Sequence, residues 1–144
     1  MHQAPIYLVE CHLTGLGWRG RLVAQPRPEA RSPRAALLAL LHGPTAAERA
    51  RGIRSALPAG TRLARLRVAR GTATVGFTGG PRRAWLSGGF YATAQVVYTL
   101  TARPGIERVW MRVRERRCCV FDHSGRPYAH PLTRAVFAGW QGAP

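Results

Sequence analysis

The spacing of hydrophobic residues first follows a helical period, between residues 33 and 42. The apolar side chains there recur at helical spacing and are Leu37, Leu38, Leu40 and Leu41. Ser32 is a good N-cap, and Pro33 after it suits the first helical position. Gly43 followed by Pro44 ends the helix. Thr45 and Glu48 then fit a capping box, so a second short helix is expected to begin at once.

Further along the chain, apolar residues recur at every second position, which predicts β-strands. Residues 65–68 and 72–77 alternate between apolar and polar side chains, and Arg70-Gly71 between them is a plausible two-residue turn. These segments therefore predict an antiparallel hairpin. Residues 109–114 alternate in the same way and predict another strand. Further strand candidates lie near the ends of the chain, at residues 5–10, 19–25 and 118–121.

A second long helix is predicted from Gly89 to about Thr101, where apolar side chains again return at helical spacing. Thr133 is a candidate cap for a last short helix that runs to Trp140. The order of elements predicts an α+β fold, with a small mixed β-sheet and two main helices packed on one face. We expect a single domain over residues 1–144, with a core at about residues 5–114 and a C-terminal extension at 115–144.

Composition adds a strong positive charge to this picture. The 144 residues include 22 basic and 6 acidic ones, for a net charge of +16, and every basic residue is arginine. Such a surface attracts phosphates, anionic lipids or acidic proteins. The alternative is a compositional bias with no functional meaning.

Four motifs, in order, resemble one known family: ALLALLHGPT, SALPAGTRL, VARGTATVGF and AQVVYTLTARPGIERVWMRV. Together they resemble the GerMN domain of sporulation and spore germination proteins. The resemblance implies a fold similar to the ring-building motif of sporulation channel proteins. It also implies a bacterial, lipoprotein-like protein of the cell envelope that takes part in protein–protein assembly, without enzymatic activity or cofactor.

The chain departs from this family at two points. Gly76 stands on the return strand where the family usually carries an acidic residue. The sequence before Pro5 also lacks the charged start and apolar core of a signal peptide. The resemblance therefore implies an extracytoplasmic location, whereas the chain with Met1 as its true start would be cytoplasmic.

Alternation places an arginine-rich set of side chains on the sheet face that the helices leave uncovered. The candidate interaction surface consists of Arg65, Arg67, Trp110, Arg112 and Arg114. The expected partners are envelope or sporulation proteins, or a second copy of the chain, because arginine and tryptophan are enriched at protein interfaces. The alternatives are a cytoplasmic domain that binds RNA or DNA by charge and stacking, and a merely solvated strand face.

The sequence offers little for catalysis or for a metal. Cys118, Cys119, His123 and His130 lie close together, with Cys11 and His12 as a distant pair, but no CxxC or HxxxH spacing occurs. Asp122-His123-Ser124 is unsuited to a triad, because neighbours in sequence cannot form its in-line hydrogen bonds. We therefore expect no catalytic residue, no metal and no cofactor. A disulfide between Cys11 and Cys118 or Cys119 is possible if their strands are neighbours.

Overall fold

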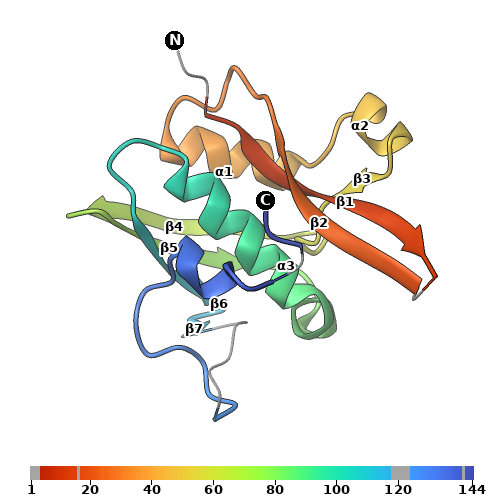
Figure 1. Cartoon of the computed structure of the whole chain (residues 1–144). Helices are drawn as coiled ribbons and strands as arrows, with labels where there is room; N and C mark the ends of the chain where they lie inside the picture. The colour runs from red at the N-terminus through yellow and green to blue at the C-terminus, as the bar shows by residue number, and fades with distance from the viewer. Residues whose placement is uncertain (1–3, 16, 118–123, 141) are drawn as a thin grey trace.

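The computed structural model describes residues 4–15, 17–117, 124–140 and 142–144. Its strands form two sheets (Figure 1). The first has the order β2-β1-β3, from β1 (Ile6–Thr14), β2 (Gly17–Gln25) and β3 (Ile53–Arg54). The second has the order β4-β5-β6-β7, from β4 (Arg62–Ala69), β5 (Thr72–Thr78), β6 (Arg108–Val113) and β7 (Arg116–Arg117). The helices are α1 (Pro33–His42), α2 (Ala46–Ala50), α3 (Arg82–Thr101) and the 3₁₀ helix η1 (Arg134–Phe137).

The four-stranded sheet is mixed, as expected. Strand β4 pairs with β5 antiparallel, and the Arg70-Gly71 turn between them has positive φ at both residues. Strand β5 pairs with β6 in parallel, and α3 is the crossover between the two. The prediction of an α+β fold with helices on a mixed sheet is confirmed. The N-terminal strands nevertheless form a separate sheet, because within the described part of the chain β1 pairs with β2 and β3 and with no strand of the second sheet.

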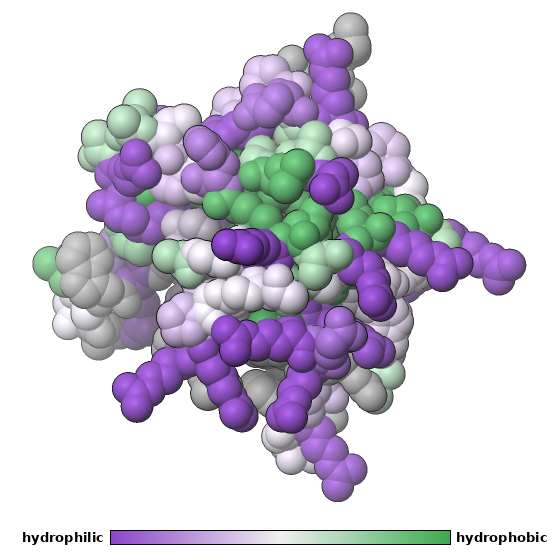
Figure 2. All heavy atoms as spheres, turned by 180° about the vertical axis from the view of Figure 1, so that it is seen from behind, coloured by the Kyte–Doolittle hydropathy of each residue, from purple (hydrophilic) through white to green (hydrophobic). Residues whose placement is uncertain are grey.

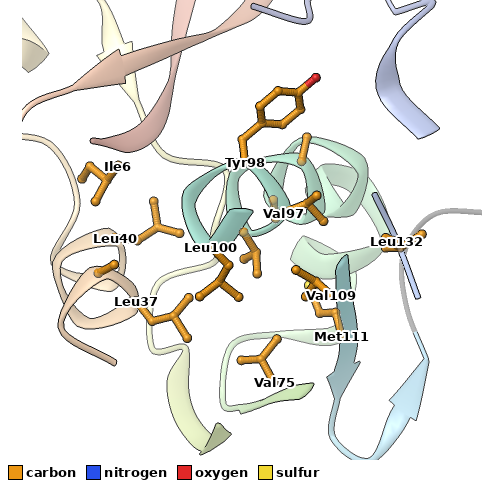
Figure 3. Close-up of a cluster of buried hydrophobic side chains, with 14 of the residues drawn as sticks. Ile6, Leu37, Leu40, Val75, Val97, Tyr98, Leu100, Val109, Met111 and Leu132 are labelled. Atoms are coloured by element: carbon orange, nitrogen blue, oxygen red, sulfur yellow. The ribbon is translucent and has the colours of Figure 1, made fainter. Parts of the chain in front are cut away.

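Helix α3 lies between the two sheets and is almost entirely buried from Ala92 to Leu100. Its apolar side chains contact the inner face of the second sheet, where Val75, Val109 and Met111 point toward the helix (Figure 3). Helix α1 adds Leu37 and Leu40 to the same cluster. One hydrophobic core therefore joins both helices to the sheet.

Two polar side chains of α3 bind the first sheet. Thr99 accepts a hydrogen bond from the Tyr7 backbone N–H at 2.9 Å, and Gln95 donates to the Tyr7 carbonyl at 3.1 Å. Gln95 also accepts from the Ala56 N–H at 2.7 Å. Strand β3 is too short to pair with β1 at Tyr7, so these side chains satisfy backbone groups that would otherwise be buried without partners.

Several local predictions are confirmed. Ser32 caps α1 by accepting from the Ala35 N–H at 3.0 Å, and Pro33 is the first residue of the helix. Thr45 and Glu48 form the complete capping box of α2.

Other predictions need correction. Helix α3 begins at Arg82 instead of Gly89 and runs through Gly88 and Gly89. The burial of Trp85 in its first turn favours helix there and outweighs the low helix propensity of the glycines. Helix η1 is a single 3₁₀ segment that ends at Phe137, three residues before the predicted end. The predicted strand at residues 118–121 lies outside the described residues.

The C-terminal extension packs into the domain. Leu132 exchanges two backbone hydrogen bonds with Val109 of β6, and Phe137 is fully buried. Arg134 donates to Thr101 Oγ1 at 2.8 Å and to the Tyr98 carbonyl at 3.0 Å, which ties η1 to the end of α3. Burial thus extends the hydrophobic core well beyond residue 114.

Candidate protein interface

The register of the second sheet brings most of the predicted surface together. Arg67 lies opposite Thr74, which lies opposite Trp110. Arg65 lies opposite Gly76, which lies opposite Arg112. Residues directly opposite each other share a face, so the two rows lie on the side away from the buried Val75 and Met111. We call this surface the open face; it consists of Arg65, Arg67, Thr74, Gly76, Trp110 and Arg112.

The charge of the open face is not neutralised by the carboxylates that the structure describes. Arg65, Arg67 and Arg112 are exposed, and none of them takes part in the ion pairs found among the described residues. Those ion pairs use other arginines and His12. Trp110 between the arginines is half-buried. The open face therefore combines three exposed guanidinium groups with one aromatic ring.

The lack of a carboxylate at Gly76 contributes to the positive charge of the open face. A Cβ added to Gly76 would lie 3.6 Å from the Cβ of Arg65, which is ordinary van der Waals contact. There is consequently room for the acidic side chain that the family resemblance led us to expect. Such a side chain would lie between Arg65 and Arg112. Without it, β5 offers no carboxylate to either arginine.

For two arginines near the open face, the structure differs from the surface that the sequence predicted. Arg114 lies in the β6–β7 turn with a φ of 52°, and its guanidinium donates to the Gly80 carbonyl at 2.5 Å. The left-handed turn ends the alternation at Val113, so Arg114 lies at the end of the sheet. Arg108 was overlooked, although it is two residues before Trp110. It donates to Thr72 Oγ1 at 3.1 Å and to Glu107 at 3.2 Å.

Three other arginines stabilise the fold. Arg27 donates to both carboxylate oxygens of Glu48, at 2.8 and 2.5 Å, and both residues are buried. These hydrogen bonds hold the pKa of Glu48 below its ordinary value. Arg103 is buried and donates to four backbone carbonyls, and burial lowers its pKa. Arg134 lies 4.6 Å above the Tyr98 ring.

A hollow also lies beside β2 of the first sheet. Two adjoining cavities of about 290 and 460 Å³ share Arg19, Gly20 and Tyr91 in their walls. Cys11 lines the first cavity and His12 the second. These two side chains point to opposite faces of β1, and His12 contacts Glu10 at 2.7 Å. Within the described residues, the hollow therefore holds no thiol–imidazole pair.

The metal and disulfide hypotheses fall largely outside the described residues, because Cys118, Cys119 and His123 belong to the segment that is not described. His130 is exposed and Cys11 is half-buried. Residues 4–15, 17–117, 124–140 and 142–144 contain no group of three or more His, Cys, Asp or Glu side chains that could hold a metal. Over the same residues, no helix is long and apolar enough to cross a bilayer.

The fold defines an α+β domain of the GerMN type. It is similar to the first GerMN domain of the sporulation protein GerM from Bacillus subtilis, with a TM-score of 0.61 and 22% identity over 94% of this chain and 99% of that one. The tandem GerMN domains of the same protein give a TM-score of 0.60 and 16% identity over 92% of this chain. This chain spans about half of that tandem structure, 46% of its length.

A putative lipoprotein from Clostridium perfringens has the same fold, with a TM-score of 0.53 and 13% identity over 90% of this chain and 87% of that one. The family model described as "Germane: Sporulation and spore germination" matches residues 12–117. The chain therefore belongs to the Germane family, which confirms the resemblance drawn from the four motifs. That family is not known to be enzymatic. No curated protein matches the sequence.

Proposed function

We propose that this chain is a non-catalytic assembly domain that binds an acidic protein partner through the open face. The exposed arginines around Trp110, which form no ion pair with any described carboxylate, carry this proposal. Because each guanidinium presents a planar set of donors, it can bind a carboxylate through two parallel hydrogen bonds. The half-buried indole between them provides apolar contact area of the kind found at interface hot spots.

Family membership supports this proposal by analogy. The family description is sporulation and spore germination, and one protein of similar structure is a putative lipoprotein. We therefore place the proposed partner at the cell envelope, among envelope or sporulation proteins. A partner with clustered carboxylates would supply the negative charge that Gly76 does not.

The test compares two triple variants with the same change in net charge. Arg65→Glu/Arg67→Glu/Arg112→Glu reverses the open face. Arg19→Glu/Arg49→Glu/Arg83→Glu reverses three exposed arginines on β2, α2 and α3. Each protein, in the full-length form that the organism produces, is purified with its bound proteins under mild conditions, and these are quantified by mass spectrometry.

We expect the open-face variant to lose a specific set of acidic proteins that the wild type and the control variant retain. Equal retention by all three proteins would contradict the proposal. Loss of nuclease-sensitive nucleic acid in place of protein would favour an RNA- or DNA-binding role. A shift from dimer to monomer in sedimentation would identify the partner as a second copy.

A further inference from the structure

Strand β4 is an edge strand with apolar side chains that the domain leaves partly uncovered. On the inner face of the sheet, Ala73 and Val75 of β5 are fully buried. Their neighbours on β4 differ: Leu66 is half-buried, and Val68 is 43% exposed. The apolar layer of the sheet therefore continues to its edge, where it is only partly covered.

Helix α1 also carries apolar side chains that the domain leaves partly uncovered. It packs beside β4, and its Leu38 is 47% exposed while Leu41, one turn further on, is half-buried. Viewed from the side opposite to Figure 1, the molecule shows a continuous hydrophobic area bordered by hydrophilic side chains (Figure 2). A contiguous apolar area of this kind is typical of an interaction site.

The geometry of the hairpin shows which backbone groups face the edge. In a two-residue hairpin the residues that flank the turn form a hydrogen-bonded pair, which here is Ala69 with Thr72. Pairs then alternate, so Arg67 and Arg65 are also bonded to β5. The N–H and C=O groups of Leu66 and Val68 consequently point away from β5, toward the open edge.

Side chains and backbone together define the pattern of a fitting strand. Residues opposite Leu66 and Val68 would lie on the uncovered apolar layer. Residues opposite Arg65 and Arg67 would lie on the open face, beside two exposed guanidinium groups. We propose that β4 accepts an added β-strand from a protein partner in which acidic and apolar residues alternate. This proposal rests on the proposed function and specifies its partner.

A second copy of the chain fits this edge poorly. If two β4 strands paired antiparallel about Leu66, Arg65 of one copy would lie opposite Arg67 of the other. Like charges directly opposite each other destabilise a sheet. The arginines thus oppose self-pairing, as charged side chains on edge strands commonly do, and favour a strand with carboxylates.

The probe is a fluorescent nine-residue peptide of alternating glutamate and valine, with blocked ends. A peptide of the same composition with its glutamates and valines in separate blocks is the control. Binding is measured by fluorescence anisotropy, and backbone protection by amide hydrogen exchange. We expect the alternating peptide to bind at least tenfold more tightly than the block peptide, and to slow exchange at the Leu66 and Val68 amides.

Two variants separate strand addition from simple charge attraction. Val68→Pro removes a backbone donor that faces away from β5, a position where an edge strand tolerates proline. It should weaken peptide binding at least tenfold while circular dichroism shows the fold intact. Arg65→Glu/Arg67→Glu should weaken peptide binding to a similar extent, although it keeps every backbone donor. Arg49→Glu on α2 should have little effect on peptide binding.

Several results would overturn the inference: no binding of the alternating peptide, equal binding of both peptides, protection outside β4, or a β4-paired dimer. Retention of the natural partner by the variants distinguishes failure of this inference from failure of the proposed function. If Val68→Pro keeps the natural partner while the open-face variant loses it, strand addition is wrong and the open face still binds. If neither variant loses a partner, both proposals fail.

Discussion

At the residue scale, the arginines of this chain include buried and exposed ones, which the sequence distinguishes only in part. Arg27 and Arg103 are buried, whereas Arg67 and Arg112 are exposed on a sheet. The strand arginines could be assigned to the open face because period-two alternation is a local property. The buried arginines could not be identified, because their partners are 21 or more residues away in sequence or are backbone carbonyls.

The buried ion pair gives a prediction about pH. Glu48→Gln keeps a side chain that can complete the capping box, but removes the charge that pairs with Arg27. We expect a loss of roughly 2 kcal/mol in unfolding free energy at pH 7. Because the folded-state pKa of Glu48 is lowered, this contribution is present above its ordinary value of 4.5 and is lost as the pH falls below it.

Urea unfolding of both proteins between pH 3 and 7 measures this difference. Glu10 also has a lowered pKa, but it is present in both proteins, so its contribution cancels. The two stabilities should converge at the acid end. A difference that stays constant over the whole range would show that the pair contributes nothing through charge.

Gly79 is required by a close approach of two backbone segments. It has a φ of 77°, and a Cβ there would overlap the carbonyl oxygen of Gly60. Gly105 has a similar φ of 84° with open space around it. Gly105→Ala should therefore cost about 1 kcal/mol and Gly79→Ala roughly 3 kcal/mol or more, as measured by thermal or urea unfolding. Equal costs would show that the backbone relaxes around Gly79.

At the element scale, the features that local rules control were predictable. The caps of α1 and α2 and the Arg70-Gly71 turn follow from a few neighbouring residues each. The division of the strands into two sheets was not, because it depends on long-range pairing and on Gln95 and Thr99 of α3. The exposure of Val68 was not predictable either, since alternation gives the face of a strand but not whether a helix covers it.

The contribution of helix η1 to stability is visible only from its tertiary contacts. Phe137 is fully buried and packs against the rings of Phe90 and Tyr98. Phe137→Ala should lower the unfolding free energy by about 3–5 kcal/mol, because a buried aromatic ring is removed. Ala135→Ser, an exposed change on the same turn, is the control and should have little effect. If both variants unfold like the wild type, the extension is not part of the cooperative core.

At the scale of the whole molecule, the structure shows where the residues behind the net charge of +16 lie. Part of it is buried or paired within the fold, and part is displayed on the open face and along β4. Charge displayed in this way attracts negatively charged molecules, and the attraction weakens as salt screens it. Family membership places the domain among sporulation and germination proteins. The open face is the surface through which we propose that this member binds a partner.

Photo-crosslinking in the organism that makes the protein tests the open face most directly. A benzophenone amino acid replaces Arg67 or Arg112 on the open face, or Arg49 on α2 as the control. After ultraviolet irradiation, we expect the two open-face positions to form a discrete adduct with an acidic protein and the control position to form none. The account would be contradicted if the open-face positions gave no adduct, or the same adducts as position 49.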